Sequence, residues 1–437
     1  MWRKKPKRLT LMINRKTQPD FKDAVDFNLE LKPYRLFTLD NGVPVYAYHA
    51  GAEEVMQLEL LFDAGSWYEG KDMVAGATNF LLKNGTTSRS AYQINEHFDF
   101  HGAYLNRNCY SETSSLMLHC LTKHLGELLP VMKEVISDSN FPQPELDIYR
   151  QNMKQRLEVS EKKCDFIASR MIDVHLYGDR HPYGRYSKAS IYDALEREEI
   201  VDFHDRFYRN GHCKIFVAGL LPSDLESQLN RAFGQFPFRK ESIPRSFIEK
   251  QPSPEKHHRI MNDPQGVQGA IRIARPFPGR HHPDFHAAQV LNTLFGGFFG
   301  SRLMSNIRED KGYTYGIYSF LQNHLEGSAW MVSTEAGREV CEATIQEVYK
   351  EMKTLREEPV DQAELLLVKN YMMGSILGDL DGPFHVIGRW KNIILNGMDE
   401  SYFYEGLRTI KQVQAGELME LARKYLLPEE FHELVVI

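Results

Sequence analysis

The chain has 437 residues, of which 42% are hydrophobic and 26% are charged, and its formal net charge is −6. This length suffices for two to four ordinary domains, and the composition is typical of a globular protein with buried cores. The negative charge argues against a general nucleic-acid binder, and no stretch reaches the roughly 18 apolar residues that a membrane-spanning helix needs.

Residues 1–30 begin with the basic run MWRKKPKRLT and are predicted to form an N-terminal tail. The apolar run Leu9–Ile13 is too short for the core of a secretory signal. The five cysteines are scattered and form no C-x-x-C pair, which favours reduced thiols. These features predict a bacterial cytoplasmic protein; a nucleic-acid or membrane arm is the alternative role of the tail.

Residues 31–240 are predicted to form a first half that begins with strands and continues with helices. The segment Arg35–Ala50 reads as two alternating strands around an Asp-Asn-Gly turn, and Val55–Trp67 alternates again. A helical pattern follows at His124–Asp138. Strands followed by helices indicate an α+β fold.

Residues 257–437 repeat the order of patterns found in the first half, after a proline-rich and charged linker at 241–256. Phe207 corresponds to Tyr425 and Leu146 to Leu365, while Asp72 corresponds to Asp284. Several matches in one order at nearly one offset indicate a duplication. We therefore predict two homologous halves, each a mainly antiparallel sheet with helices packed on one face.

Several short motifs of the first half stand in an order that resembles the insulinase or pitrilysin family, the inverzincin metallopeptidases. They are Gly65-Ser66 with Glu69, Gly85-Thr86, Gly102, Asn106 and Glu112. Members of that family carry H-x-x-E-H on a helix, where two histidines bind Zn²⁺ and the glutamate takes a proton from the metal-bound water.

The positions that correspond to H-x-x-E-H here are Asn79, Leu82 and Lys83, so we predict no catalytic residue and no metal ligand in this chain. An amide is a poor zinc ligand, Leu82 cannot act as a base, and Lys83 brings a positive charge. No histidine lies between Ala50 and His97, so no register restores the motif. Glu158 and Glu161, in the region of the third ligand, are interpreted as solvated helix residues.

The segment Gly296–Ser319 of the second half, GGFFGSRLMSNIREDKGYTYGIYS, closely resembles a second sequence motif of the family. The resemblance implies that Arg308 and Tyr315 hold the substrate peptide. A guanidinium offers fixed donors to a carbonyl or carboxylate, and a tyrosine hydroxyl donates to a carbonyl oxygen. The alternative is structural: Arg308 would cap a helix or pair with its acidic neighbours, and Tyr315 would pack in a strand.

The family includes peptidases made of two different chains, one with the zinc motif and one without it. The resemblance therefore implies a non-catalytic subunit of a heterodimeric zinc peptidase, with zinc in an H-x-x-E-H partner and an unfolded peptide enclosed between the chains. The first alternative is a non-proteolytic binding or assembly protein of the same fold, including a homodimer.

The second alternative is a zinc metallopeptidase with a relocated site, because His282 and His286 stand at i, i+4 spacing. No glutamate lies between them, and Pro283 is better placed to start a helix. A dense loop at Tyr177–Arg185, which includes His-Pro-Tyr-Gly, is predicted to form a turn, with peptide contact as its alternative role.

Overall fold

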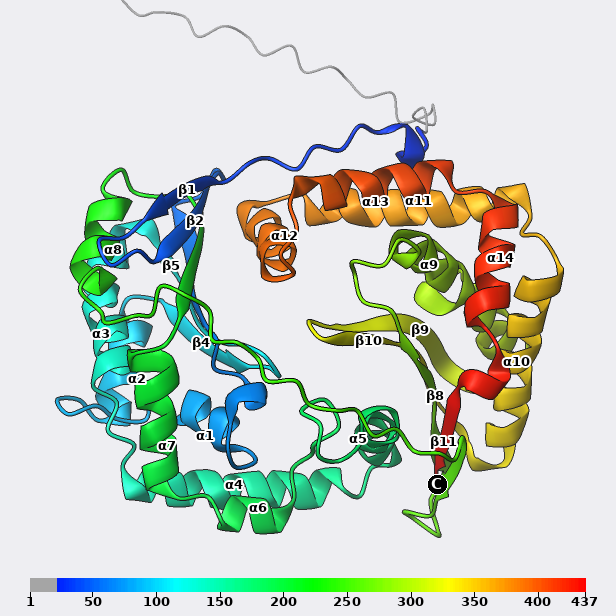
Figure 1. Cartoon of the computed structure of the whole chain (residues 1–437), viewed down its shortest axis with the longest axis horizontal. Coiled ribbons are helices and arrows are strands. Elements are labelled where there is room, and N and C mark those ends of the chain that lie inside the picture. Colours follow the sequence, from blue (N-terminus) through cyan, green and yellow to red (C-terminus); the bar gives the residue numbers. More distant parts are fainter. Residues whose placement is uncertain (1–21) are drawn as a thin grey trace, which may run out of the picture.

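The computed structural model of the protein describes residues 22–437, so most of the predicted basic tail lies outside the described residues. The described chain forms two sheets that lie side by side, one from each half of the sequence (Figure 1). Among these residues, no helix combines the length and the apolar character that crossing a membrane requires.

The first half contains a six-stranded sheet in the order β1-β2-β6-β3-β5-β4. Its strands are β1 (Arg35–Thr38), β2 (Pro44–His49), β3 (Val55–Phe62), β4 (Tyr104–Cys109), β5 (Ser114–Leu121) and β6 (Cys213–Gly219). Its helices are η2 (Ser66–Tyr68), α1 (Val74–Leu81), α2 (Ala91–Phe100), η3 (Thr122–His124), α3 (Leu125–Ser137), α4 (Gln143–Ser160), α5 (Cys164–Tyr177), α6 (Ala189–Asp193), α7 (Arg197–His204), η4 (Asp205–Arg209) and α8 (Leu225–Phe233), and the short helix η1 (Ala24–Asp26) precedes this half.

The second half contains a five-stranded sheet in the order β7-β11-β8-β10-β9. Its strands are β7 (His257–Ile260), β8 (Gln268–Phe277), β9 (Thr314–His324), β10 (Gly327–Gly337) and β11 (His432–Val436). Its helices are α9 (Phe285–Asn292), η5 (Thr293–Gly297), η6 (Met304–Asp310), η7 (Arg338–Val340), α10 (Cys341–Glu357), α11 (Gln362–Asp379), α12 (Pro383–Leu395), α13 (Glu400–Gln412), α14 (Ala415–Tyr425) and η8 (Pro428–Glu430).

The two sheets have the same topology. The order β2-β6-β3-β5-β4 corresponds strand by strand to β7-β11-β8-β10-β9. In each sheet the first of these strands runs parallel to the last strand of its half, and the other pairings are antiparallel. The predicted α+β fold with two homologous halves is therefore confirmed, and β1 is an additional edge strand of the first sheet.

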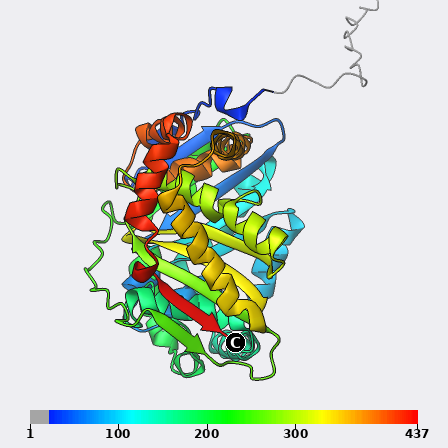
Figure 2. The same ribbon diagram turned by 90° about the vertical axis from the view of Figure 1, so that its right-hand side faces the viewer.

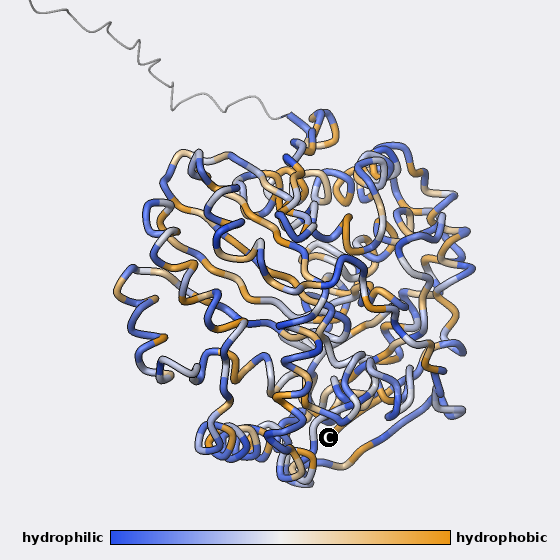
Figure 3. Tube along the Cα trace, turned by 60° about the vertical axis from the view of Figure 1, so that its left-hand side comes forward, coloured by the Kyte–Doolittle hydropathy of each residue, from blue (hydrophilic) through white to orange (hydrophobic). Residues whose placement is uncertain are grey.

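Each sheet carries its main helical layer on its outer face. Along β3 the side chains of Met56, Leu58, Leu60 and Phe62 alternate toward this layer and are completely buried. In the second half, α10 and α14 lie over the outer face of the sheet (Figure 2). Hydrophobic stretches concentrate in the strands, whereas the peripheral helices alternate between hydrophobic and hydrophilic residues, as amphipathic surface helices do (Figure 3).

The inner face of the first sheet is covered by α12, a helix of the second half (Figure 1). Trp390 of α12 is buried beside Leu61 and Phe216 of the first sheet. Lys391 forms an ion pair of 2.7 Å with Glu59, whose carboxylate on β3 is only 2% exposed. The second half therefore supplies part of the core of the first.

The inner face of the second sheet is covered in turn by α5, a helix of the first half. Ala168 and Ile172 of α5 are fully buried against Ala270 and Ala274 of β8, whose small side chains let the helix approach closely. Arg272 of β8 pairs with Asp165 at the start of α5. The two halves therefore exchange one helix each, in addition to the predicted outer layers.

Residues 22–34 add a third connection between the halves. This N-terminal segment crosses the second half before the chain enters the first sheet at β1 (Figure 1). The N–H of Val25 donates to Asn370 of α11 over 3.1 Å, and Lys411 of α13 donates to the carbonyl of Phe27 over 2.9 Å. Leu29 and Leu31 are buried in the core of the second half.

Candidate functional site

Helix α1 carries the degenerate motif, and the carboxylate of Glu69 fixes where this helix begins. One oxygen of Glu69 accepts from the N–H of Met73 over 3.2 Å, and the other accepts from Ala75 over 2.9 Å. Met73 has a φ of 70°, so the chain turns sharply at the helix start. Burial raises the pKa of Glu69 to about 7, although Arg185 lies 3.7 Å away. Glu69 therefore satisfies free backbone donors of the helix.

The three predicted motif positions do not share an open face of α1. Asn79 is buried, and its amide donates to the hydroxyl of Tyr208 over 3.1 Å. Leu82 is fully buried. Lys83 follows the end of the helix, where burial and then the charge of Arg107 lower the pKa of its ammonium. Asn79 and Leu82 are therefore core residues, and Lys83 lies beside another cation.

The face of α1 that is not buried presents Gly76 and Phe80, which are four residues apart. A side chain at Gly76 would point into open space. The ring of Phe80 packs at 5.0 Å from Tyr149 and at 4.8 Å from the Arg107 guanidinium. Burial lowers the pKa of Arg107 to about 10. A phenyl ring and a guanidinium cannot ligate a dication, so the residues here do not fit zinc.

The sequence analysis does not identify Phe80 and Arg107, because it aligns the first histidine of H-x-x-E-H with Asn79. The available signal was the i, i+4 spacing of Gly76 and Phe80, whose side-chain positions face the same way once the helix begins after Met73.

Glu158 and Glu161, at the end of α4, lie away from this face. Glu158 is nine residues beyond Tyr149, which corresponds to about 14 Å along the helix. Both glutamates are exposed, and Glu161 pairs with Arg170 over 3.2 Å.

Arg308 and Tyr315, by contrast, lie together. Arg308 belongs to the π-helical turn η6 and Tyr315 to the start of β9. The Arg308 guanidinium lies between two aromatic rings, 4.6 Å from Phe299 and 5.2 Å from Tyr315. Within residues 22–437 it forms no ion pair, so it does not bind Glu309 or Asp310. The ring of Tyr315 is 92% exposed.

The Arg308–Tyr315 pair stands at one end of an edge strand that is rich in exposed aromatic residues. Strand β9 pairs only with β10 among the described strands, and the π-helical turns η5 and η6 contact its other edge. Tyr318 and Phe320 are partly exposed and face the same side as Arg272, toward the inner helix α5. In the first sheet, Tyr104 of the edge strand β4 is also exposed.

The far end of β9 contacts the first half through the predicted loop Tyr177–Arg185. Tyr183 donates to the carboxylate of Glu112 and accepts from the N–H of Glu326 over 2.9 Å. Glu112 also accepts from the N–H of Leu325 over 3.2 Å. The loop therefore joins the tip of the β9–β10 hairpin to the β4–β5 turn of the first half.

This contact lies far along the hairpin from Tyr315. Ten residues of extended strand between Tyr315 and Leu325 span about 33 Å. The exposed pair at Arg308 and Tyr315 therefore lies at the opposite end of the strand from the part of the hairpin that contacts the first half.

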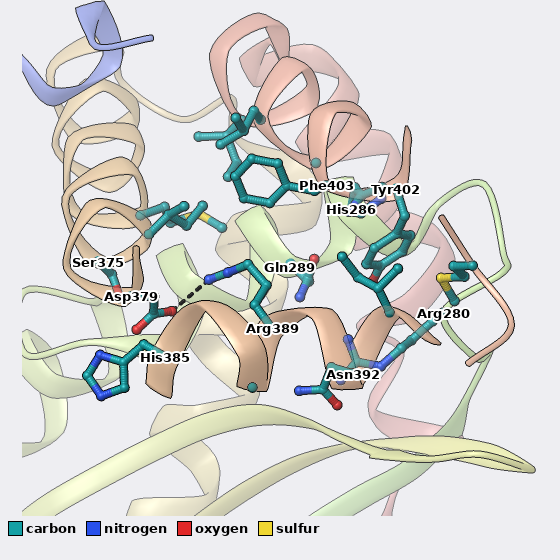
Figure 4. Close-up of a pocket in the computed structure, with 18 of the residues that line it drawn as sticks. Arg280, His286, Gln289, Ser375, Asp379, His385, Arg389, Asn392, Tyr402 and Phe403 are labelled. Atoms are coloured by element: carbon teal, nitrogen blue, oxygen red, sulfur yellow. Dashed lines mark hydrogen bonds and ion pairs between the residues drawn. The ribbon is translucent and has the colours of Figure 1, made fainter. Parts of the chain in front are cut away.

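His282 and His286 line one pocket, but no third side chain within residues 22–437 completes a metal site with them. His282 accepts the N–H of Asp284 over 3.1 Å and forms part of the turn before α9. His286 lines a cavity of about 630 Å³ and packs on Tyr402, with ring centroids 4.4 Å apart (Figure 4). In the same cavity Arg389 is paired with Asp379 over 2.7 Å. Within residues 22–437, the one set of three side chains with metal-ligand spacing lies elsewhere.

Two family models match the chain. The model described as "Insulinase (Peptidase family M16)" matches residues 45–181, and "Peptidase M16 inactive domain" matches residues 194–372. Among curated relatives, an "uncharacterized zinc protease" of Rickettsia felis is 24% identical over 357 residues, which cover 79% of this chain and 83% of the relative. The "non-peptidase homolog YmxG" of Helicobacter pylori is 23% identical over 328 residues, or 73% and 74% of the two chains.

Two solved structures share the fold over nearly their whole length. A "peptidase M16 inactive domain" from Pseudomonas fluorescens superposes with a TM-score of 0.82 at 24% identity and covers 92% of this chain and 98% of its own. A protease from Helicobacter pylori superposes with a TM-score of 0.83 at 16% identity, over 92% and 99% of the two chains.

Proposed function

Because the chain belongs to the insulinase family, peptidase family M16, and lacks the H-x-x-E-H motif, we propose that it is the non-catalytic subunit of a heterodimeric zinc peptidase. In this proposal the partner is a homologous chain that carries the motif. The two chains enclose an unfolded peptide, and this chain supplies half of the enclosing surface.

The observation that carries the proposal is the exposed pair of Arg308 and Tyr315. The Arg308 guanidinium is held in place by two aromatic rings and binds no carboxylate within residues 22–437. Since the partly buried guanidinium has no carboxylate partner among the described residues, its donors are available to a ligand supplied from outside the chain. The pair also stands at the end of β9 opposite the hairpin tip that contacts the first half, which suits a role at another chain's site.

The chemistry of the pair suits a peptide. The guanidinium presents several donors to a peptide carbonyl or carboxylate, and the tyrosine hydroxyl donates to a carbonyl oxygen. Tyr318 and Phe320 are exposed on the same strand and provide apolar contact for the peptide.

Zinc belongs to the partner in this proposal. Relatives of the chain carry the name zinc protease, and a zinc ion polarises the scissile carbonyl and activates water in such enzymes. Phe80 and Arg107 occupy the open face of α1 here, so this chain's own part is to bind and orient the peptide.

The test is reconstitution. The purified chain is assayed on a quenched fluorescent peptide, alone and mixed with an H-x-x-E-H chain from the same genome. We expect no cleavage by the lone chain, and cleavage by the mixture beyond that of the partner alone. A mixture that is no more active than the partner alone, across the candidate partners of that genome, contradicts the heterodimer.

Arg308→Ala tests the peptide-holding role within the same assay. Loss of a charged hydrogen bond should lower kcat/KM of the mixture roughly tenfold or more, without loss of the fold. Arg209→Ala is the matched control, because its side chain is exposed in the first half and its one ion pair among the described residues is with Asp205. An unchanged kcat/KM for Arg308→Ala would refute the role.

The name of the Helicobacter pylori relative, a non-peptidase homolog, favours a second candidate: a binding or assembly protein without proteolysis. That candidate predicts peptide binding by the lone chain, or a homodimer, with no gain in cleavage upon mixing. Fluorescence anisotropy with a labelled unfolded peptide and sedimentation of the lone chain separate the two functions.

A further inference from the structure

A histidine and carboxylate cluster lies where the end of α2 meets the start of α3, outside every site described above. His101 follows the last residue of α2, His124 ends η3, and Glu127 lies in the first turn of α3. The three potential ligand atoms all lie within 4.8 Å of one another.

Hydrogen bonds define the state of the His101 ring. Its Nδ1 lies 2.9 Å from the carbonyl oxygen of His97, and a carbonyl only accepts, so Nδ1 carries the proton. In the neutral ring, Nε2 then presents a lone pair, and this atom lies 3.0 Å from an oxygen of Glu127. Nδ1 of His124 lies 3.1 Å from the same oxygen. Two ring nitrogens therefore converge on one carboxylate oxygen, an arrangement that needs protons or a cation between them.

We propose that His101, His124 and Glu127 form a binding site for a divalent transition-metal ion of the zinc class. Two imidazoles and a carboxylate favour zinc, nickel, cobalt or copper over magnesium or calcium, which prefer oxygen ligands. The site is separate from α1, and the proposal does not depend on the proposed peptidase partner.

Two of the three ligand separations are close to those of a tetrahedral site. Two ligands that are each about 2.1 Å from a zinc ion lie about 3.4 Å apart. The two nitrogen–oxygen separations of 3.0 and 3.1 Å are slightly shorter than this, so small side-chain rotations would admit the ion.

The two histidine side chains of the cluster are largely buried, whereas the glutamate side chain is exposed to solvent. The His101 side chain is 11% exposed and the His124 side chain 27%, whereas that of Glu127 is 60% exposed, which leaves room for a water as fourth ligand. Nε2 of His97 donates to the backbone carbonyl of Glu127 over 3.0 Å. His97 thus bonds both flanks of the site and orients it, as outer residues of metal sites do. A bound ion would tie the end of α2 to the start of α3.

The experiment is a titration of the full-length chain, stripped with EDTA, with zinc chloride and separately with magnesium chloride. Isothermal titration calorimetry and elemental analysis of the dialysed protein measure the stoichiometry and the Kd. The variants are His124→Asn and Glu127→Gln, which keep side-chain size. His282→Asn is the matched control, because it removes a histidine far from the cluster. Circular dichroism in EDTA verifies that each variant is folded.

We expect one zinc per chain with a Kd in the micromolar range or tighter, and no saturable magnesium binding. Both cluster variants should weaken zinc binding at least tenfold, and the control should bind as the natural chain does. Absence of saturable zinc binding at one ion per chain overturns the proposal. So does unchanged affinity in both cluster variants, or loss of binding in His282→Asn, which would point to α9.

Discussion

Glu59 and Arg272 occupy matching positions on β3 and β8 and carry opposite charges. Glu59 lies opposite Phe216 of β6, and Arg272 lies opposite the corresponding residue Leu434 of β11. Both side chains are almost fully buried, and each is paired with a charge on the helix that the other half contributes. The same contact between a strand and an exchanged helix therefore occurs in both halves, with the negative charge on the strand in the first half and the positive charge on the strand in the second.

Replacing Lys391 by Met should leave the Glu59 carboxylate buried without its partner. Removing one member of a buried ion pair costs about 3–5 kcal/mol, and the lower end applies because the Lys391 side chain is 25% exposed. Urea unfolding measures the loss. The double variant Glu59→Leu with Lys391→Met should recover most of it, since no unpaired charge remains. A single variant as stable as the natural chain would show that the pair does not join the halves.

Replacing Tyr315 by Phe removes one hydroxyl and keeps the ring on which Arg308 stacks. If the hydroxyl binds the peptide in the assembled peptidase, kcat/KM of the reconstituted pair should fall about fivefold or more. Tyr318→Phe is the control, because Tyr318 lies on the same strand and its side chain, which is 52% exposed, also reaches solvent. Equal activity of the two variants would leave Arg308 as the residue that holds the peptide.

Replacing Tyr183 by Phe should loosen the tip of the β9–β10 hairpin. The hydroxyl of Tyr183 joins Glu112 to the N–H of Glu326, and an unsatisfied buried group costs about 1–3 kcal/mol. Hydrogen exchange at Leu325 and Glu326 should become faster. Tyr177→Phe is a matched control because the buried Tyr177 hydroxyl has no partner within the described residues. If exchange at the tip stayed unchanged, the hairpin would be held by other contacts.

Acidification should destabilise the protein between about pH 6.5 and pH 4. Burial lowers the pKa of His204 to about 4, and its Nε2 donates to the carbonyl of Ile136 over 2.8 Å. The unfolded chain takes up this proton near pH 6.5. Stability is therefore complete above that pH and falls as the pH drops, by about 2 kcal/mol at pH 5 for this residue.

Four further histidines have pKa values lowered to about 4 by burial, so the effect should accumulate. They are His175, His181, His324 and His432. Melting temperatures measured from pH 7 to pH 5 test this. The His204→Gln variant keeps a donor for Ile136 and should show a shallower decline with pH. A decline as steep as that of the natural chain would show that His204 titrates normally.

Replacing Leu31 by Ala should weaken the attachment of the N-terminal segment. Leu31 is 2% exposed in the core of the second half, and truncating such a residue costs about 2 kcal/mol or more. Leu36→Ala, on the neighbouring strand β1, is the control because its side chain is 54% exposed. Urea unfolding of the two variants gives the difference. Similar stability of both would mean that the segment contributes little to the core.

The strands and the duplication were predictable because they depend on local patterns. Period-two alternation in Val55–Phe62 and the Asp-Asn-Gly turn specify strands without reference to the rest of the chain. The exchange of α5 and α12 was not predictable, because an amphipathic helix shows which of its faces is buried but not which sheet it covers.

The candidate site was predictable in part for the same reason. The motif around Arg308 and Tyr315 is continuous in sequence, and the structure places the two side chains together; their role toward a peptide stays a prediction. The face of α1 depends on where the helix begins, which Glu69 and the backbone of Met73 set. The sequence alone therefore predicts Asn79, Leu82 and Lys83 as the motif positions. In the structure, the open face of α1 carries Gly76 and Phe80 instead. The cluster of His101, His124 and Glu127 combines residues 23 and 26 positions apart, which only the fold brings together.

Because each half holds a helix of the other, the two halves should stay together even when the chain between them is cut. Phe247, in the segment between the two halves, is 90% exposed, so chymotrypsin can cut beside it. The N-terminal fragment would still hold α5 in the second sheet, and the C-terminal fragment would still hold α12 in the first. The nicked protein should therefore remain one particle until it is denatured. A gene divided at this codon is accordingly a natural starting point for a split protein whose pieces reassemble when they are produced together.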